Sequence, residues 1–273
     1  MAITADYHLH SSHSGDSDAP MEHMIQSAIS RGLTHMCFTE HMDLGYPVTP
    51  ETPAGLFEVN TDAYRAELLR LREQYAPQIQ IAFGIELGLQ PGLAQRIRAY
   101  SVSCDFDFII GSSHVAGGKD PYYPSFYEGR TEEEAYREYF QSIIDNIESF
   151  SNYDVYGHLD YVVRYGPNKD RDYSYAKYRD LFDKMLSLLL DQGKGIELNT
   201  AGIRKGMRDA NPCMDVLKRY RQLGGELITT GSDAHRPEDV AADFARAEEI
   251  LTACGFRYYA VFQNRRPEYR KIG

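Results

Sequence analysis

Short apolar segments alternate with amphipathic segments along almost the whole chain, and this alternation limits the possible fold most strongly. The apolar segments have the length of strands, and the amphipathic segments carry apolar residues at helical spacing between charged ones. Strands that alternate with helices pair in parallel, because each helix returns the chain to the start of the next strand. The segments expected as strands are residues 6–10, 34–39, 79–85, 106–111, 154–157, 195–199, 226–230 and 258–262.

Seven or eight such units in 273 residues predict an α/β barrel of irregular shape. The chain has no linker-like stretch and no obvious internal repeat, so we expect one domain over residues 1–273. A doubly wound open sheet is the alternative. Neither Gly-x-Gly-x-x-Gly nor a Walker-type loop is present to support the nucleotide binding typical of that fold.

Three local patterns predict where helices begin. Residues 17–20 combine a capping side chain with a proline near the first turn, and Gly32 ends this helix. Thr131 and Glu134 form a capping-box pattern. Pro237 is expected to begin a last long helix.

Two histidines, His8 and His10, stand at the end of the first predicted strand. Residues i and i+2 of a strand share one face, so the two rings aim at the same point. Neutral imidazoles that converge in this way suit a metal ion.

Six of the nine histidines and two acidic residues lie at, or just past, the C-terminal end of a predicted strand. In a parallel β/α barrel these ends meet on one face, where active sites lie. His13, His23 and His35 do not fit the pattern and are interpreted as ordinary surface or core residues. We interpret the others as a metal or catalytic cluster rather than as separately satisfied side chains: His8, His10, His41, His114, His158, His235, Glu86 and Asp233.

This set is larger than the about four ligands that a single tetrahedral ion takes. A carboxylate such as Glu86 can bridge two ions, so we expect a multinuclear site of divalent metals. Paired ions lower the pKa of a shared water and hold a phosphoryl group for in-line attack. Hydrolysis of a phosphate ester is therefore the expected chemistry.

Several short motifs occur in a fixed order: His8-Leu9-His10, Ser14-Gly15-Asp16-Ser17-Asp18, Thr39-Glu40-His41, Gly84-Ile85-Glu86, Ser113-His114, Gly157-His158-Leu159-Asp160, Asn199-Thr200-Ala201-Gly202-Ile203-Arg204 and Ser232-Asp233-Ala234-His235. In their order and spacing the chain resembles the PHP (polymerase and histidinol phosphatase) superfamily, in particular its histidinol-phosphate phosphatase branch. The resemblance covers nearly the whole chain.

The resemblance implies a distorted (β/α)7 barrel with a trinuclear centre at the C-terminal ends of the strands. It implies up to three zinc, iron or manganese ions and hydrolysis of L-histidinol phosphate to L-histidinol and phosphate in histidine biosynthesis. By resemblance, the first ion would be held by His8, His10, Glu86 and Asp233, the second by Glu86, His114 and His158, and the third by Asp16, His41 and His235.

Arg164 and Arg204 follow strand ends on the same face, where the family branch has arginines. A guanidinium offers a planar fork to phosphate oxygens. We therefore expect both to bind the substrate phosphate and to stabilise its developing charge, and we expect Asp233 or His235 to move the proton.

Other residues near the strand ends are expected to support this site. Glu40 and Asp160 are expected to orient the ligands. Loops 42–60 and 116–130 either close over the alcohol part of the substrate or pack on the barrel rim. The aromatic residues concerned are Tyr122, Tyr123, Phe126 and Tyr127.

Composition restricts the partners. Asp and Glu number 40 against 29 Lys and Arg, for a net charge of -11, and nonspecific nucleic-acid binding needs a basic footprint. Residues 1–6 lack the features of a signal peptide, and no apolar run approaches membrane-spanning length. The four cysteines form no CxxC pair, so we expect free thiols in a cytoplasmic protein.

Two rival functions remain open from the sequence. One is a PHP-type phosphoesterase that acts on nucleotides or other small phosphate esters. The other is a non-catalytic, metal-stabilised module that serves as a partner domain. Loss of metal ligands would favour the second rival, and none of the expected ligands is missing.

Overall fold

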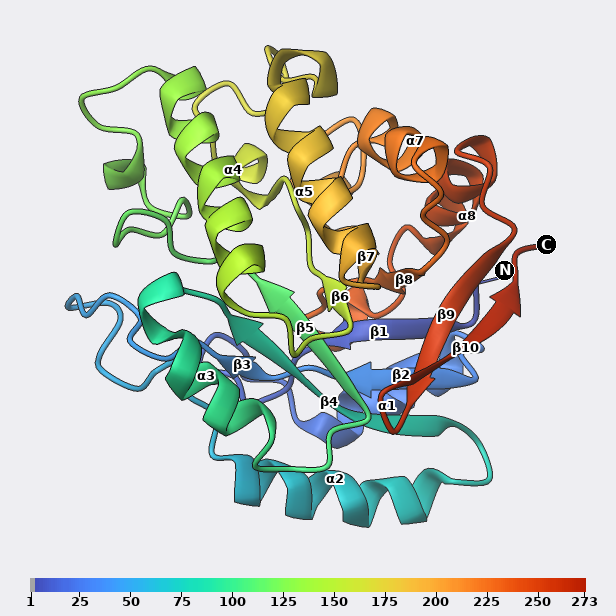
Figure 1. Cartoon of the computed structure of the whole chain (residues 1–273). Coiled ribbons are helices and arrows are strands. Elements are labelled where there is room, and N and C mark those ends of the chain that lie inside the picture. Colours follow the sequence, from blue (N-terminus) through green and yellow to red (C-terminus); the bar gives the residue numbers. More distant parts are fainter. Residues whose placement is uncertain (1–2) are drawn as a thin grey trace.

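The computed structural model describes residues 3–273, and its main strands run parallel around a barrel (Figure 1). The barrel strands neighbour one another in chain order: β1 Ala5–Leu9, β2 His35–Phe38, β4 Gln80–Gly88, β5 Phe108–Ser112, β6 Val155–Tyr156, β7 Gly195–Asn199 and β8 Ile228–Gly231. A short strand, β3 His41–Met42, pairs with the far end of β4. Doubly wound sheets reverse their strand order, and this sheet does not. The barrel is therefore confirmed, and the open-sheet alternative is wrong.

The barrel closes where β1 meets β8 and the residues just after it, through an isolated bridge rather than a ladder. Leu9 forms a single parallel bridge with Ala234, and the backbone N–H of Asp233 donates to the carbonyl of His8 over 2.8 Å. The register of β1 against β2 also shifts between Asp6 and Leu9. Irregularities of this kind re-aim side chains beside active sites, and here they distort the barrel at the strand that carries His8.

Helices alternate with the strands along the chain, and most of them lie on the outside of the barrel (Figure 1). They are α1 Met21–Ser30, α2 Thr61–Tyr75, α3 Ala94–Ser101, α4 Glu132–Ser149, α5 Arg179–Asp191, α6 Ala201–Arg204, α7 Met214–Gln222 and α8 Phe244–Ala253, with 3-10 turns at Pro91–Leu93, Pro124–Phe126, Tyr161–Arg164, Tyr175–Tyr178 and Pro237–Asp239. Helices α2 and α3 lie on one side of the strands, and α4, α5 and α7 on the other (Figure 1).

The sequence pattern explains why these helices pack. Helix α5 buries Phe182, Met185, Leu186 and Leu189, which follow the i, i+3, i+4, i+7 spacing of one helix face. The predicted capping box at the start of α4 is confirmed. Within residues 3–273, none of the helices has both the length and the apolar character needed to cross a bilayer. Residues 1–2, which belong to the segment expected to lack a signal peptide, lie outside the described part.

The last predicted strand is present, but it does not join the parallel sheet. Strands β9 Tyr258–Gln263 and β10 Arg266–Lys271 form a separate antiparallel hairpin. The Tyr7 hydroxyl donates to the carbonyl of Phe262 over 3.0 Å, and the rings of Phe262 and Phe108 lie 4.8 Å apart. The hairpin thus packs against residues at the start of β5, away from the strand ends that carry the site.

The expected capping of α1 by residues 17–20 is wrong. Ser17 donates its hydroxyl to the carbonyl of His235 over 2.9 Å instead, and Pro20 directly precedes the helix without a side-chain cap. The Ser17 hydroxyl, which the local pattern assigned to the start of the helix, therefore makes a tertiary hydrogen bond instead.

The last long helix does not begin at Pro237, which opens only a short 3-10 turn. Helix α8 begins at Phe244. Between them, the backbone N–H of Ala241 donates to the buried Asp6 carboxylate over 2.9 Å, and Ala241 has a φ of 52°. A left-handed residue interrupts a right-handed helix, so this tertiary hydrogen bond accounts for the later start.

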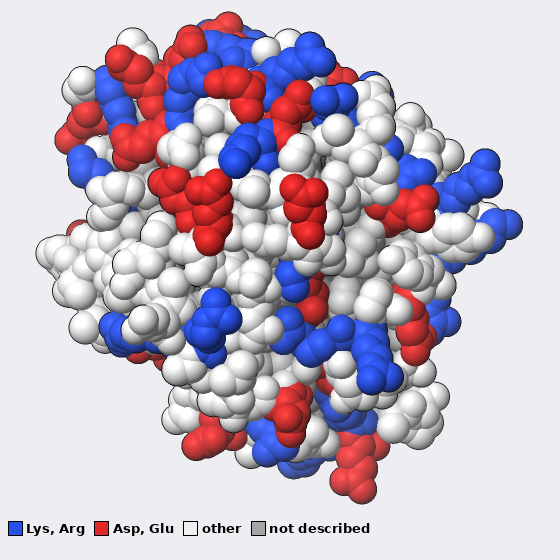
Figure 2. Space-filling view, viewed as in Figure 1, with Lys and Arg blue, Asp and Glu red and all other residues white. Residues whose placement is uncertain are grey.

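Charged side chains of both signs are interspersed on the molecular face drawn in Figure 2, with uncharged surface between them. Within the described chain, some basic groups are paired with acidic ones, as Arg265 is with Asp154 at 2.6 Å. This mixture agrees with the lack of a basic block in the sequence.

Candidate metal centre

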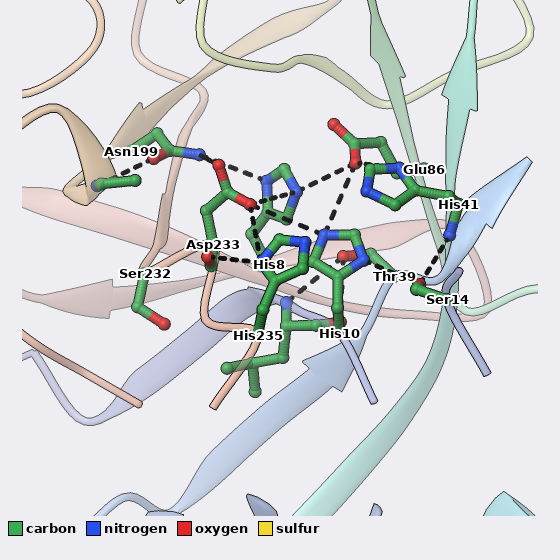
Figure 3. A network of polar contacts seen from close by, with 12 residues as sticks. His8, His10, Ser14, Thr39, His41, Glu86, Asn199, Ser232, Asp233 and His235 are labelled. Carbon is green, nitrogen blue, oxygen red and sulfur yellow. Dashed lines mark hydrogen bonds and ion pairs between the residues drawn. The ribbon is translucent and has the colours of Figure 1, made fainter. Parts of the chain in front are cut away.

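The side chains predicted at the strand ends converge (Figure 3). His8 comes from β1, His41 from β3 and Glu86 from β4. The loops that directly follow strands supply the others, which are His10, His114, His158, Asp233 and His235. Asp233 and His235 are partly exposed and the rest are buried.

Glu86 lies at the centre of the cluster. Its Oε2 atom is 3.2 Å from His8 Nε2 and 3.2 Å from His41 Nδ1. Its Oε1 atom is 3.0 Å from His158 Nε2 and 3.3 Å from His114 Nε2. Burial raises the pKa of this carboxyl, but the imidazoles of His8 and His114 outweigh it and hold the pKa well below its usual range. Glu86 is therefore an ionised carboxylate with histidines beside both oxygens.

Asp233 offers one oxygen to the cluster. Its Oδ1 atom lies 3.6 Å from His10 Nε2 and 3.7 Å from His8 Nε2. Its Oδ2 atom accepts hydrogen bonds from Arg164 and Asn199 at 2.9 and 3.2 Å. Asp233 also has a φ of 54°. Left-handed residues other than glycine gather at functional sites, where the surrounding structure holds them.

Asp16 reaches the cluster from an exposed loop. Its Oδ2 atom lies 3.1 Å from His235 Nε2 and 3.6 Å from His41 Nε2. Partial desolvation raises the pKa of the Asp16 carboxyl, but His41 and His235 outweigh it and hold the pKa well below the usual range. The stacked rings of His10 and His41, 4.2 Å apart, join this part to the rest of the cluster.

The donor set fits divalent metal ions. Nitrogen and oxygen ligands at about 2.0–2.2 Å from a tetrahedral ion lie roughly 3.3–3.6 Å from one another, close to the separations above. Several buried atoms have no hydrogen-bond partner within the described chain, which costs about 1–3 kcal/mol each unless something else binds them. They include His8 Nε2, His10 Nε2, His41 Nδ1, Glu86 Oε2 and His235 Nε2.

Four overlapping triplets have ligand atoms within 4.8 Å of one another. They are His8, His10 and Asp233; His8, Glu86 and His158; His41, Glu86 and His114; and His10, His41 and His235. These triplets differ from the three groups that the family resemblance implies, because Asp16 is in none of them and His114 and His158 fall in different triplets.

Two buried carboxylates orient the histidines and were not singled out from the sequence. Glu197 Oε1 lies 2.6 Å from His8 Nδ1, and Asp43 Oδ1 lies 2.7 Å from His114 Nδ1. Burial lowers the pKa of His114, but Asp43 and Glu86 outweigh it and raise the pKa to about 10. Carboxylates behind metal-binding histidines fix the ring and its tautomer. The sequence contains a signal for each of these carboxylates. Glu197 interrupts an apolar strand, and Asp43 follows His41 at position i+2.

Glu40 supports the cluster through an intermediate residue. Its Oε2 atom accepts from the Ser14 hydroxyl at 2.5 Å, and that hydroxyl lies 3.0 Å from His10 Nδ1. Asp160 makes a similar indirect link: it accepts from the Asn211 amide, whose oxygen accepts from Arg164 Nε at 2.6 Å. Glu40 thus reaches a candidate ligand through Ser14, and Asp160 reaches an arginine through Asn211.

The two predicted arginines differ in their free donors. Arg164 is buried, and its Nε, Nη1 and Nη2 atoms donate to Asn211, Asp233 and Asn199. Arg204 donates through Nη2 to the carbonyl of Ser232 at 2.7 Å. Its Nη1 atom is buried and has no hydrogen-bond partner in residues 3–273. Of the two, Arg204 is therefore the arginine with a nitrogen atom that has no hydrogen-bond partner in this part of the chain.

A cavity of about 830 Å³ opens onto the cluster and is lined by both arginines. Loops 42–60 and 116–130 form part of its wall, and the Tyr46 hydroxyl joins them by donating to Asp120 Oδ2 over 2.5 Å. Tyr122 and Tyr123 line the cavity. Phe126 and Tyr127 pack on the barrel rim instead; Phe126 is fully buried, and Tyr127 donates to the carbonyl of Val162.

The fold and the cluster define a metal-dependent hydrolase built on a parallel β/α barrel. The chain belongs to the PHP domain family, whose sequence model matches residues 6–201.

Two curated relatives and one solved structure show where the chain stands within this family. The histidinol-phosphatase of Lactococcus lactis subsp. lactis (strain IL1403) is 33% identical over 97% of each chain. The probable histidinol-phosphatase of Clostridium acetobutylicum is 29% identical over 92% of this chain and 94% of that protein. A crystal structure of the Lactococcus lactis histidinol phosphate phosphatase, complexed with zinc, L-histidinol and phosphate, matches with a TM-score of 0.87 and 32% identity, over 97% of this chain and 98% of that one.

Proposed function

We propose that this chain is a metal-dependent phosphomonoesterase that hydrolyses L-histidinol phosphate to L-histidinol and phosphate in histidine biosynthesis. The observation that carries the proposal is that a histidine and carboxylate cluster and two arginines face one cavity. The narrower choice of substrate is supported by the similarity to the Lactococcus lactis enzyme, whose structure holds zinc, L-histidinol and phosphate.

We propose up to three zinc, iron or manganese ions, held as the family resemblance groups them. The first would lie between His8, His10, Glu86 and Asp233, the second between Glu86, His114 and His158, and the third between Asp16, His41 and His235. When bound, such ions supply a nucleophilic water of lowered pKa and neutralise the charge of the phosphate. Glu197 and Asp43 would hold the rings of His8 and His114 in the orientation that the ions need.

The arginines would act differently on the phosphate. Arg204 would donate directly to a phosphate oxygen through its unused Nη1 atom, as a charge-assisted hydrogen bond. Arg164 would contribute a fixed positive charge beside the phosphate and hold Asp233 Oδ2 at 2.9 Å, leaving Asp233 Oδ1 to the cluster. Both charges stabilise the negative oxygens that develop in the transition state.

We assign the proton transfers to Asp233 and His235. Asp233 faces the cluster through Oδ1, and its pKa is held well below the usual range because His8 and Arg164 outweigh the effect of burial. His235 lies at the cavity, with Nδ1 3.1 Å from the carbonyl of Asp233 and Nε2 beside Asp16. We propose that these two residues accept and deliver the protons of the reaction.

A direct test is phosphate release from L-histidinol phosphate by the purified protein before and after chelation. Release that stops on chelation and returns with added zinc or manganese supports the proposal. We further propose a small-molecule substrate rather than nucleic acid, and a cytoplasmic location. Binding assays with oligonucleotides and cell fractionation test these two points.

A further inference from the structure

The cavity extends beyond the metal cluster to a second, organic end. Tyr161 connects the two: its ring lies 5.7 Å from that of His114 and 5.1 Å from that of His158. Its hydroxyl lies 3.4 Å from Asp120 Oδ1. A group bound beside Asp120 would therefore sit about one tyrosine side chain away from a phosphate held at the cluster.

Asp120 is an unusual carboxylate for this position. It is only 7% exposed, yet it lines the cavity. Oδ2 accepts from the Tyr46 hydroxyl at 2.5 Å, and Oδ1 accepts from the Tyr122 backbone N–H at 2.7 Å. Within the described chain its hydrogen-bond donors are tyrosine hydroxyls and one backbone N–H, so none of them carries a positive charge.

The carboxylates of the cavity nearest the cluster already have cationic or metal-binding partners. Glu86 and Asp233 belong to the cluster, and Asp43 binds His114. A carboxylate has roughly four lone-pair sites, and Asp120 uses three of them. It therefore has room for one more donor, and a cationic donor would also balance its charge.

Aromatic rings surround this end of the cavity. The rings of Tyr122 and Tyr165 lie 5.1 Å apart, and those of Tyr161 and Tyr165 lie 5.0 Å apart. Tyrosine faces attract cations. A buried carboxylate among such faces suits an organic ammonium group.

We propose that Asp120 is a specificity-determining residue that binds the protonated amino group of the alcohol released by the reaction. The inference rests on the proposed function, because it takes L-histidinol phosphate as the ester. It places the phosphate at the cluster and the ammonium group at Asp120, so phosphate esters of amino alcohols fit better than neutral esters.

The test compares Asp120→Asn with the wild type on L-histidinol phosphate and on phenyl phosphate, which has no cationic group. Losing a charge-assisted hydrogen bond should lower kcat/KM for L-histidinol phosphate about 10- to 100-fold, mostly through KM. For phenyl phosphate, kcat/KM of the variant should stay within about twofold of the wild-type value, because the variant keeps all contacts to the phosphate group. Equal losses on both esters, or no loss on either, would overturn the proposal.

A matched control is Glu128→Gln, which makes the same charge change in the same loop at an exposed residue outside the cavity lining. It should leave the ratio of the two kcat/KM values unchanged. A measurement on the wild type alone needs no folded variant: L-histidinol should inhibit more strongly than the same alcohol without its amino group. Equal inhibition would also overturn the proposal.

The proposed function is tested by a different quantity, which is the substrate preference of the wild type. If the wild type prefers a nucleoside monophosphate, L-histidinol phosphate is the wrong substrate. Failure of the Asp120 assignment is read only from the ratio of variant to wild type and from the inhibition by the two alcohols.

Discussion

The Nδ1 atom of His8 lies 2.6 Å from Oε1 of Glu197, and both side chains are buried. This contact directs the other ring nitrogen, Nε2, toward Glu86 and Asp233. The second oxygen of Glu197 accepts from the backbone N–H of His158 at 3.0 Å. One carboxylate behind the cluster thus orients a ring on β1 and the chain after β6.

Glu197→Gln should weaken metal binding while leaving the barrel folded. The amide keeps the shape of the side chain but removes the charge that supports His8. Changes to such supporting groups cost about 10- to 100-fold in metal affinity or activity. Metal titration of the chelated protein measures this, with the exposed Glu226→Gln as the matched control. Affinity equal to the wild type would contradict the role given to Glu197.

Gly231→Ala should disturb the same contact between His8 and Glu197. A Cβ at this position would collide with Glu197 Oε1 and with the Cβ of His8. Overpacking typically costs about 1–3 kcal/mol, and here it should also displace the carboxylate. We expect a lower melting temperature together with reduced metal content. Gly92→Ala, where an added Cβ meets nothing within 4 Å, is the control. A Gly231→Ala protein with normal metal content would contradict the account.

Arg204→Ala should lower turnover without removing metal. The loss of a charge-assisted hydrogen bond to phosphate, on the order of 1.5–3 kcal/mol, corresponds to roughly a tenfold to hundredfold fall in kcat/KM. Steady-state kinetics combined with elemental analysis separates the two effects. Arg208→Ala, an exposed arginine outside the cavity lining, should behave as the wild type. Unchanged kinetics in Arg204→Ala would show that its Nη1 atom does not bind substrate.

Mildly purified protein should carry up to three divalent ions per chain, as the ligand groups suggest. Elemental analysis gives the number, and dialysis against a chelator should remove both the ions and the activity. Metal content near zero in a protein whose activity resists chelators would contradict the metal centre.

The histidines of the site could be predicted from the sequence because each one lies at, or just past, the end of a predicted strand. The apolar pattern locates the strand ends, and the parallel barrel brings these ends to one face. His8, His41 and Glu86 needed only this rule. Glu197 could not be assigned in this way, because its contact with His8 joins residues that are 189 positions apart and depends on side-chain geometry.

The errors in the fold have a similar origin. The local pattern at Pro237 is that of a helix start, but the Asp6 carboxylate binds the backbone of Ala241 from the other end of the chain. Ser17 likewise donates its hydroxyl to His235 instead of capping α1. Tertiary hydrogen bonds overrode local propensity at both places, next to loops that carry the site.

The most direct test of the central claim is kcat/KM for L-histidinol phosphate and for a nucleoside monophosphate, measured with one metal-loaded preparation. The tyrosine-lined cavity could stack either an imidazole or a base, so the comparison is a demanding one. The account predicts a clearly higher kcat/KM for L-histidinol phosphate. More efficient hydrolysis of the nucleotide would contradict the assigned substrate.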